Sequence, residues 1–312
     1  MPLWSRRPRV VAKAEPVDAP STARLPRASG SKPLDSEIDI HGLTHPGRVR
    51  AENQDHFFIG QLKKQIHVHS TSLPEVAQLP VNLERLAFLI MVADGVGRGS
   101  VGGEASRIAL EAVTRYVAES IDCYYASDPD NDEVFVRALS DAATRCHEDL
   151  LRRAVEAPGG LSMATTLTLF IGVWPRAYLV QVGDSRYYQF RDGELVQISS
   201  DQTIAQALVD QKIFSPAEAA SSRLSSVLSS AIGGSEATPV VTRIDVDRSV
   251  VHLFCSDGLT RHLSSERISE RLRTMTSARQ ACEALLQDAL DGGGGDNVTI
   301  VVGRVLSPEG GG

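Results

Sequence analysis

A run of apolar residues at 86–92 carries no charge and predicts a buried strand, which ends in the acidic residue Asp94. Glycines follow at positions 95, 97, 99, 102 and 103. From Ala105 the apolar residues recur at helical spacing: Ile108, Ala109, Ala112, Val113, Tyr116 and Val117. This stretch therefore places a carboxylate at the end of a core strand, beside a loop whose glycines let another group approach the backbone closely.

The remaining pattern predicts mostly short strands. Alternating residues at 38–44 and 56–60 predict a first antiparallel hairpin. Residues 165–174 and 176–190, with a further strand after the Asp192-Gly193 turn, predict an antiparallel meander. The other expected elements are a helix after residue 132, a helix near 201–211, strands at 240–246 and 250–255, two helices near 264–290 and a last strand within 292–305.

Composition divides the chain into one domain and two ends. Residues 1–36 are rich in Pro, Arg, Ala and Ser without an apolar period, which predicts a disordered basic tail. Residues 37–306 carry the strand and helix patterns of a single domain, and 307–312 predict a flexible end. Within the domain, the polar stretch 61–85 is interpreted as an insertion, and 204–235 as a looser segment.

Charge and cysteine content limit the function classes. The chain has 312 residues, 42% of them hydrophobic and 23% charged, with a net charge of −7. Residues 1–37 hold seven Lys/Arg against four Asp/Glu, so the remainder carries −10, which argues against nucleic-acid binding. The four cysteines, at 123, 146, 255 and 282, match no zinc or disulfide spacing. No apolar run suits a signal peptide or a membrane span, so we expect a cytoplasmic protein.

Two kinds of site fit the glycine-rich loop after Asp94. Gly97, Gly99 and Gly102 spell the GxGxxG fingerprint of dinucleotide binding between a strand and a helix. However, Asp94 would place negative charge beside the pyrophosphate, and the later elements do not alternate as βαβ units. The alternative makes Asp94 a metal ligand on a rigid strand, and it predicts further carboxylates at other strand ends.

Such carboxylates recur along the chain. Asp257 follows an apolar strand as Asp94 does, and Asp296 precedes the last strand; GDSR at 183–186 is a similar polar cluster. A single Asp-Gly pair is a common turn, but the recurrence predicts that Asp94, Asp257 and Asp296 meet at one end of a layered sheet core. Converging carboxylates need cations, and two Mg²⁺ or Mn²⁺ ions can activate water for attack on a phosphoryl group. Arg50 would suit the phosphate oxygens through its bidentate fork.

Two other segments resemble metal sites only weakly. His67 and His69 alternate but have no third ligand nearby, so we interpret them as exposed residues. The run DPDND at 128–132 resembles the start of a calcium loop, but Glu133 and Leu139 stand where the loop needs Gly and Glu. We interpret that run as a loop that caps the following helix.

Six motifs, taken in order, resemble those of the bacterial metal-dependent type 2C protein serine/threonine phosphatases: RAENQD at 50–55, ADGVG at 93–97, MATT at 163–166, GDSR at 183–186, CSDGLT at 255–260 and GGDNVT at 294–299. The resemblance covers about residues 38–305. It implies an α+β fold, a four-layer α/β/β/α sandwich of two antiparallel β-sheets flanked by helices, with the site at one end between the sheets. It also implies that the segment 204–235 corresponds to a mobile flap beside the site.

The resemblance implies metal ligands. Asp94 would bridge two Mn²⁺ or Mg²⁺ ions, and Gly95 would lend its backbone carbonyl. Asp257 and Asp296 would complete the shell of the first ion. Asp184, together with Asp257, would form a third and weaker site.

It implies roles around the substrate as well. Arg50 would bind the phosphate, and Asp55 and Gln54 would hold metal-bound waters. A water or hydroxide between the two ions would attack phosphorus without a covalent phospho-enzyme. Arg50, Asp94, Asp257 and Asp296 are therefore the expected catalytic residues.

The chain departs from the family pattern at two places. Gln54 stands where a Glu is usual, which lowers the local negative charge and predicts weaker metal affinity. Arg98, Gly99 and Ser100 stand where a histidine often follows the Asp-Gly pair. That histidine is proposed to protonate the leaving oxygen, so here a metal-bound water would do it and turnover is expected to be slower.

Two functions remain open from the sequence. The first is hydrolysis of phosphorylated proteins by a monomer that opposes a serine/threonine kinase. The second is a pseudophosphatase that binds phosphoproteins without hydrolysing them, and the retention of Asp94, Asp257, Asp296 and Arg50 argues against it. Partner choice is expected to depend on 61–85 and 204–235, with neither nucleic acid nor membrane as a partner.

Overall fold

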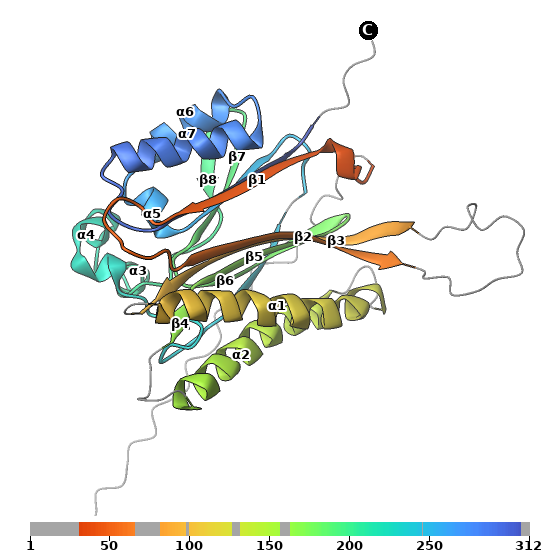
Figure 1. The fold of residues 1–312 in the computed structure, drawn as a ribbon, viewed down its shortest axis with the longest axis horizontal. Coiled ribbons are helices and arrows are strands. Elements are labelled where there is room, and N and C mark those ends of the chain that lie inside the picture. Colours follow the sequence, from red (N-terminus) through yellow and green to blue (C-terminus); the bar gives the residue numbers. More distant parts are fainter. Residues whose placement is uncertain are drawn as a thin grey trace, which may run out of the picture.

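The computed structural model describes residues 31–65, 82–97, 100–126, 132–156, 163–244 and 246–306. In this part of the chain two antiparallel sheets pack face to face, and helices cover the outer face of each (Figure 1). The predicted fold class, an α/β/β/α sandwich, is confirmed.

Each sheet is antiparallel throughout. The first has the strand order β1-β11-β10-β7-β8, and its strands are β1 (Ile38–His45), β7 (Arg186–Arg191), β8 (Glu194–Gln197), β10 (Val251–Cys255) and β11 (Val298–Val305). The second has the order β2-β3-β5-β6-β9, with β4 paired to the end of β3. Its strands are β2 (Asp55–Gln65), β3 (Asn82–Val96), β4 (Ala164–Thr165), β5 (Leu167–Val173), β6 (Arg176–Val182) and β9 (Val240–Ile244).

The helices begin where the sequence supplies capping residues. The second sheet is covered by α1 (Val101–Ala126) and α2 (Glu133–Glu156), and the first by α6 (Ser265–Arg273) and α7 (Ala278–Asp291). The short helices are α3 (Ile204–Asp210), α4 (Pro216–Ser221), α5 (Asp257–Thr260) and the 3-10 helices η1 (Asp35–Glu37) and η3 (Arg223–Ser226). Four helices have an N-cap residue whose side-chain oxygen accepts a hydrogen bond from a backbone N–H of the first turn. The helices are α3, α4, α6 and α7, and their N-cap residues are Thr203, Ser215, Ser264 and Ser277.

Alternation along β3 explains why its apolar run is continuous. Leu89, Met91 and Ala93 pack against α1 and α2, whereas Ile90 and Val92 pack against the other sheet. Both faces of the strand are therefore buried, because one meets helices and the other meets a sheet. A strand in that position has no solvent face on which a charge could lie until it reaches Asp94.

The expected hairpin between 38–44 and 56–60 is wrong. β1 pairs with β11, and β2 pairs with β3, so the two segments belong to different sheets. The alternating patterns identified both strands correctly, but alternation does not specify a partner. The connection between them carries Arg50 across the end of the sandwich.

The strand expected at 176–190 is two strands. β6 ends at Val182, and the chain crosses through Gly183, which has φ of +101°, to begin β7 at Arg186 in the other sheet. A side chain at position 183 would be strained there, and its Cβ would lie 2.7 Å from Thr166 Cγ2. The predicted meander is therefore antiparallel but divided between the two sheets.

The expected ends and insertions are described only in part. Residues 31–36 belonged to the expected tail, yet Asp35 pairs with Lys63 and Arg85, so this stretch packs on the extended β2–β3 hairpin. Strand β2 continues to Gln65 and β3 starts at Asn82, so both ends of the 61–85 insertion are strand. His67, His69, Arg98 and Gly99, like the tail up to residue 30 and the end from 307, lie outside the described residues.

The run at 128–132 is described only at its last residue. Asp132 accepts a hydrogen bond at 2.5 Å from the Tyr178 hydroxyl and pairs with Arg243, so its carboxylate fixes α2 to the second sheet. The side chains of Cys146, Cys255 and Cys282 are buried free thiols.

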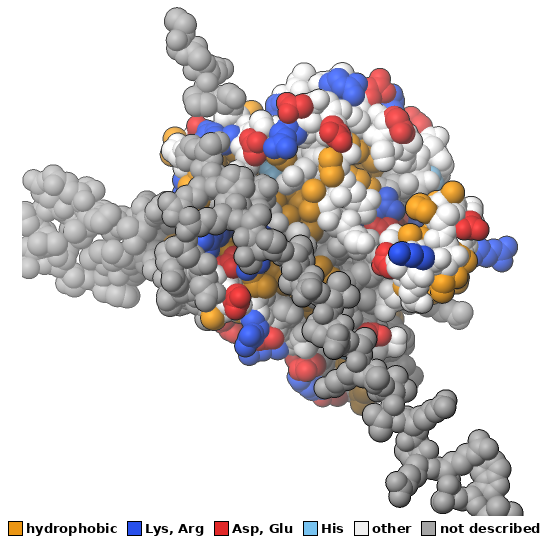
Figure 2. All heavy atoms as spheres, turned by 180° about the vertical axis from the view of Figure 1, so that it is seen from behind, with side chains coloured by type: hydrophobic (Ala, Val, Ile, Leu, Met, Phe, Trp, Pro, Cys, Tyr) orange, Lys and Arg blue, Asp and Glu red, His pale blue; other side chains and the backbone are white. Residues whose placement is uncertain are grey.

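On the face shown in Figure 2, cationic and anionic side chains are interspersed over the described surface. No helix in the described ranges is long and apolar enough to cross a membrane.

Candidate active site

Asp94 is held at its backbone from both sides. It lies inside β3, two residues before the strand ends, and is paired with Asp55 at the start of β2. The Asp94 carbonyl accepts from Thr166 N at 2.9 Å and from Thr165 Oγ1 at 2.8 Å, and Asp94 N donates to Thr166 Oγ1 at 2.9 Å. The MATT segment therefore fixes the backbone that presents this carboxylate.

Gly95 permits a close contact with the start of α1. A Cβ at this position would lie 2.1 Å from the Gly102 carbonyl oxygen and 2.7 Å from the Gln54 carbonyl oxygen. Gly95 N also donates to Gln54 O at 3.2 Å. No side chain fits between these three backbone segments, so glycine is required at position 95.

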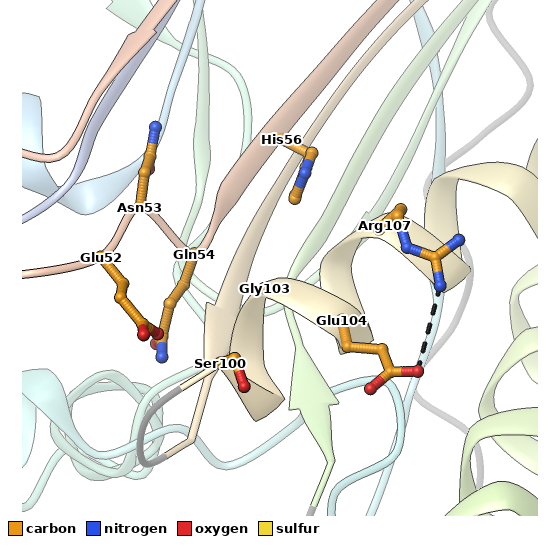
Figure 3. A pocket seen from close by; sticks show the side chains of 8 residues that line it. All are labelled: Glu52, Asn53, Gln54, His56, Ser100, Gly103, Glu104 and Arg107. Carbon is orange, nitrogen blue, oxygen red and sulfur yellow. Dashed lines mark ion pairs between the residues drawn. The ribbon is translucent and has the colours of Figure 1, made fainter.

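Gln54 lines an open cleft of about 480 Å³ (Figure 3). A Cβ at Gly102 would lie 2.7 Å from Gln54 Oε1, so this side chain rests on the first turn of α1. The cleft is lined by Glu52, Asn53, Gln54, His56, Ser100, Gly103, Glu104 and Arg107. Figure 3 shows Glu52 and Gln54 extending toward the end of the cleft where Ser100 lies.

Asp55 is a buried carboxylate that is only half satisfied. Its Oδ2 accepts from Ser256 Oγ at 2.6 Å, and Ser256 Oγ in turn accepts from Thr299 N at 3.0 Å. Its Oδ1 is buried and has no hydrogen-bond partner. Burial raises the pKa of Asp55 to about 6, and the Asp257 charge adds to the rise. A buried oxygen with an open lone pair is suited to a cation or to a water held by one.

Asp257 and Asp296 reach the site from the first sheet. Asp257 opens α5 directly after β10, and Asp296 precedes β11. The guanidinium of Arg50 grips Asp296 at two points, with Nε 2.8 Å from Oδ1 and Nη2 2.9 Å from Oδ2. Arg261 also pairs with both acids: its Nη1 lies 2.9 Å from Asp296 Oδ2, and its Nη2 contacts Asp257 Oδ2.

Asp184 follows Gly183 at the crossing between the sheets. The residue is buried, with 7% of its surface exposed. Burial raises its pKa to about 7, with further contributions from the charges of Asp257 and Asp201. The turn is fixed because Gln202 Oε1 accepts from Gly183 N at 2.8 Å.

These acids form one electrostatic cluster. Burial, followed by the charges of Asp55, Asp257, Asp184 and Asp296, raises the pKa of Asp94 well above its usual value. Burial also raises the pKa of Asp257, against the opposing charge of Arg261. Asp94 is therefore surrounded by four other carboxylates whose charges disfavour its ionisation, an environment that divalent cations would stabilise.

The donor set fits a hard divalent cation, although the side chains as placed do not form a closed cage. Every candidate ligand is an oxygen, and Asp55 Oδ1 is left open. Among the described residues, no three Asp, Glu, His or Cys side chains stand ready to hold an ion. At two of the acids, Asp296 and Asp257, guanidinium N–H groups of Arg50 and Arg261 engage carboxylate oxygens.

The structure adds residues that sequence reasoning had not singled out. Asn297 ties the Arg50 loop to β11, because its amide donates to Pro46 O and Glu52 O and accepts from Gln54 N, each at 2.9 Å. Asp201 holds Arg186 through three hydrogen bonds of 2.7 to 3.1 Å. Ser256, Asn297 and Asp201 all stand inside polar clusters of the sequence, whereas Arg261 follows the CSDGLT motif directly.

A family model, protein phosphatase 2C, matches residues 78–291. The chain therefore belongs to the protein phosphatase 2C family. The matched residues include Asp94, Asp184 and Asp257, whereas Arg50 and Asp296 lie outside them.

Curated relatives are serine/threonine protein phosphatases of bacteria. PstP of Mycobacterium tuberculosis is 37% identical over 221 residues, which are 70% of this chain and 41% of PstP. The chain thus matches about two fifths of that relative's length. The phosphatase Stp of Listeria monocytogenes is 25% identical over 230 residues, 71% of this chain and 86% of Stp.

Solved structures agree over a longer span. The crystal structure of M. tuberculosis PstP has a TM-score of 0.69 at 30% identity, and the match covers 86% of this chain and 99% of that one. The PstP catalytic domain in complex with two manganese ions has a TM-score of 0.63 at 30% identity, with the same coverage.

Proposed function

We propose that the chain is a metal-dependent phosphatase that removes phosphate from phosphoserine and phosphothreonine in proteins, opposing bacterial serine/threonine kinases. The observation that carries the proposal is the cluster of five carboxylates beside the guanidinium of Arg50: Asp55, Asp94, Asp184, Asp257 and Asp296. The names of the mycobacterial and Listeria relatives support the substrate class.

The proposed metal content is two Mn²⁺ or Mg²⁺ ions, which the manganese complex of PstP supports. Asp94, the Gly95 carbonyl, Asp257 and Asp296 would hold the ions. Asp55 and Gln54 would hold waters, and Asp184 with Asp257 would hold a third ion more weakly. Ions bound there would lower the pKa of water, so that hydroxide is available to attack phosphorus near neutral pH.

Side chains of the protein would bind and orient the phosphate. The Arg50 fork already binds a two-oxygen anion, the carboxylate of Asp296, in the geometry that two oxygens of a phosphate would take. Arg50 would thereby orient the phosphate for attack from the carboxylate side. Asn297 positions Arg50, since its amide holds the loop through Pro46 O and Glu52 O.

We also propose that the segment 204–235 contributes to partner choice. It is joined to the site through Gln202, whose carbonyl accepts from Ser229 N at 2.9 Å and whose side chain binds Gly183 N. A partner that presses on this segment would act two hydrogen bonds away from Gly183, the residue before Asp184.

The decisive experiment is hydrolysis of a phosphothreonine peptide with Mn²⁺, with Mg²⁺ and with EDTA, for the unaltered protein, Asp257→Asn and Asp247→Asn. Asp247 is the matched control because it lies before β10, pairs with Arg191 and bonds Ser249, away from the carboxylate cluster. We expect activity only with a divalent ion, a loss on the order of 1,000-fold in Asp257→Asn, and little change in Asp247→Asn.

Other outcomes would redirect the proposal. Activity that persists in EDTA would exclude the metal-dependent mechanism. If Mn²⁺ binds but no phosphate is released from any peptide, the chain is a phosphoprotein-binding module instead. A third outcome, equal losses in Asp257→Asn and Asp247→Asn, would mean that the substitutions disturb the fold and that the cluster has no special role.

A further inference from the structure

Arg261 occupies the carboxylates that the proposed metals need. Its Nη1 lies 2.9 Å from Asp296 Oδ2, and its Nη2 contacts Asp257 Oδ2. Arg50 takes both oxygens of Asp296 from the other side. Three of the four carboxylate oxygens of this pair of acids are thus engaged by guanidinium groups.

The position of Arg261 follows from local helix geometry. It stands four residues after Asp257, at the end of α5, and its backbone N–H donates to Asp257 O at 2.9 Å. Residues four apart lie on the same face of a helix, so the Arg261 side chain is directed back toward Asp257. Asp296, from the loop before β11, then completes the two-carboxylate contact.

Arg261 can leave this contact at low cost. Its side chain is 42% exposed, so the guanidinium can turn into water without being buried elsewhere. Arg186 offers a contrast in the same molecule: it is 30% exposed, binds both oxygens of Asp201 and donates to the Tyr188 hydroxyl at 3.0 Å. The structure therefore fixes Arg186 at several points and leaves Arg261 free to exchange.

We propose that Arg261 is an internal counter-ion that competes with divalent metal for Asp257 and Asp296, and so sets the metal affinity of the site. The inference rests on the proposed function, since it assumes that these two acids are metal ligands. A lone pair that accepts an Arg261 N–H cannot at the same time coordinate an ion at full strength, so metal must displace the guanidinium. Removing the guanidinium should strengthen metal binding.

The test is calorimetric titration of metal-stripped protein with Mn²⁺, comparing the unaltered chain with Arg261→Gln, Arg261→Lys and Arg48→Gln. Arg48 is the matched control: it lies in the same end of the molecule, its side chain is 55% exposed, and it pairs with Asp291 rather than with a proposed ligand. We expect on the order of tenfold tighter binding for Arg261→Gln, and at most about a twofold change for Arg48→Gln. Arg261→Lys, which keeps the charge but loses the two-point contact, should fall between.

A second readout separates competition from a structural role. In EDTA, Arg261→Gln should lower the melting temperature, because Asp257 and Asp296 lose a counter-charge. In saturating Mn²⁺ this difference should shrink toward zero, because the tighter binding offsets the stability that the metal-free variant loses. A residue that merely supports the fold would lower the melting temperature under both conditions.

Three results are informative in different ways. Equal Mn²⁺ affinity in Arg261→Gln and the unaltered chain would overturn the competition. Equal gains in Arg261→Gln and Arg48→Gln would also overturn it, since the effect would then be general charge. If the unaltered protein does not bind Mn²⁺, the proposed function itself fails, and that failure is seen before any variant is compared.

Discussion

Two acidic sites in this molecule differ in how their charge is neutralised. On the outer face of the first sheet, Asp288 of α7 accepts four hydrogen bonds of 2.7 to 3.0 Å from Arg267 and Arg271 of α6. These arginines lower the pKa of Asp288 to about 2. At the end of the sandwich, five carboxylates share Arg50 and Arg261, and burial raises the pKa of Asp94, Asp55 and Asp184.

The difference teaches how to separate a structural ion pair from a site built for a ligand. One acid with two cations is satisfied by the chain itself, and it stabilises the α6–α7 contact. Five acids with two cations are not satisfied, and keeping their charges together away from water lowers the stability of the fold. Such an excess is neutralised by bound protons or by a cation from outside the chain, and it is typical of functional sites.

The largest effect should come from Asp94→Asn. Removal of the central carboxylate should lower metal-dependent peptide hydrolysis on the order of 1,000-fold. The melting temperature in EDTA at pH 8 should rise, because a charge disfavoured by burial and by four other acids is gone. Phosphate release and thermal melting measure the two effects, and loss of both activity and stability would contradict the comparison.

Asp184→Asn should change the pH dependence of stability. The folded-state pKa of Asp184 is about 7 against an ordinary value of 3.8, so between these pH values the folded chain holds a proton that the unfolded chain releases. Stability in EDTA should therefore fall as pH rises from about 4 to 7, and the variant should recover as much as about 4 kcal/mol of that loss. Urea unfolding at pH 4.5 and pH 8 measures this, and a gain of equal size at both values would speak against the raised pKa.

Asp288→Asn should produce the smallest effect, with the opposite sign. The lowered pKa of Asp288 means that its contribution is present above about 4 and is lost as pH falls through about 2. At pH 7 the variant should lose about 1–2 kcal/mol, because the side chains of Arg267 and Arg271 are 40% and 30% exposed and solvent screens these ion pairs. Urea unfolding measures the loss, and peptide hydrolysis should stay within about twofold.

Much of the candidate site was predictable from local sequence. Asp94, Asp184, Asp257 and Asp296 each stand beside an apolar strand, and the structure brings all four together with Asp55. The pattern of an acidic residue beside a glycine next to an apolar run located them, because a charge next to a buried strand must lie at a sheet end. The roles of these residues as metal ligands stay a prediction, as do those of Gly95, Gln54 and Asp55.

Other features of the site were beyond reach because they depend on contacts between distant residues. Asn297 donates to Pro46 O and Glu52 O, which are separated from it by about 250 residues. The GGDN motif does not predict these partners. Ser256 joins Asp55 to Thr299 only because the two sheets meet there. The pairing of β1 with β11 instead of β2 is a failure of the same kind.

The amino-acid sequence identified most of the buried strands, the longer helices and the set of acidic residues at strand ends, whereas the fold class followed from the resemblance to the phosphatase family. The sequence could identify these elements because hydrophobic period, turn chemistry and capping act within a few residues. Tertiary structure alone decided which strands share a sheet, where the chain crosses at Gly183, and which cations face the acids. Those outcomes arise because burial brings together residues from opposite ends of the chain, as when Arg50 and Arg261 meet on the carboxylate of Asp296.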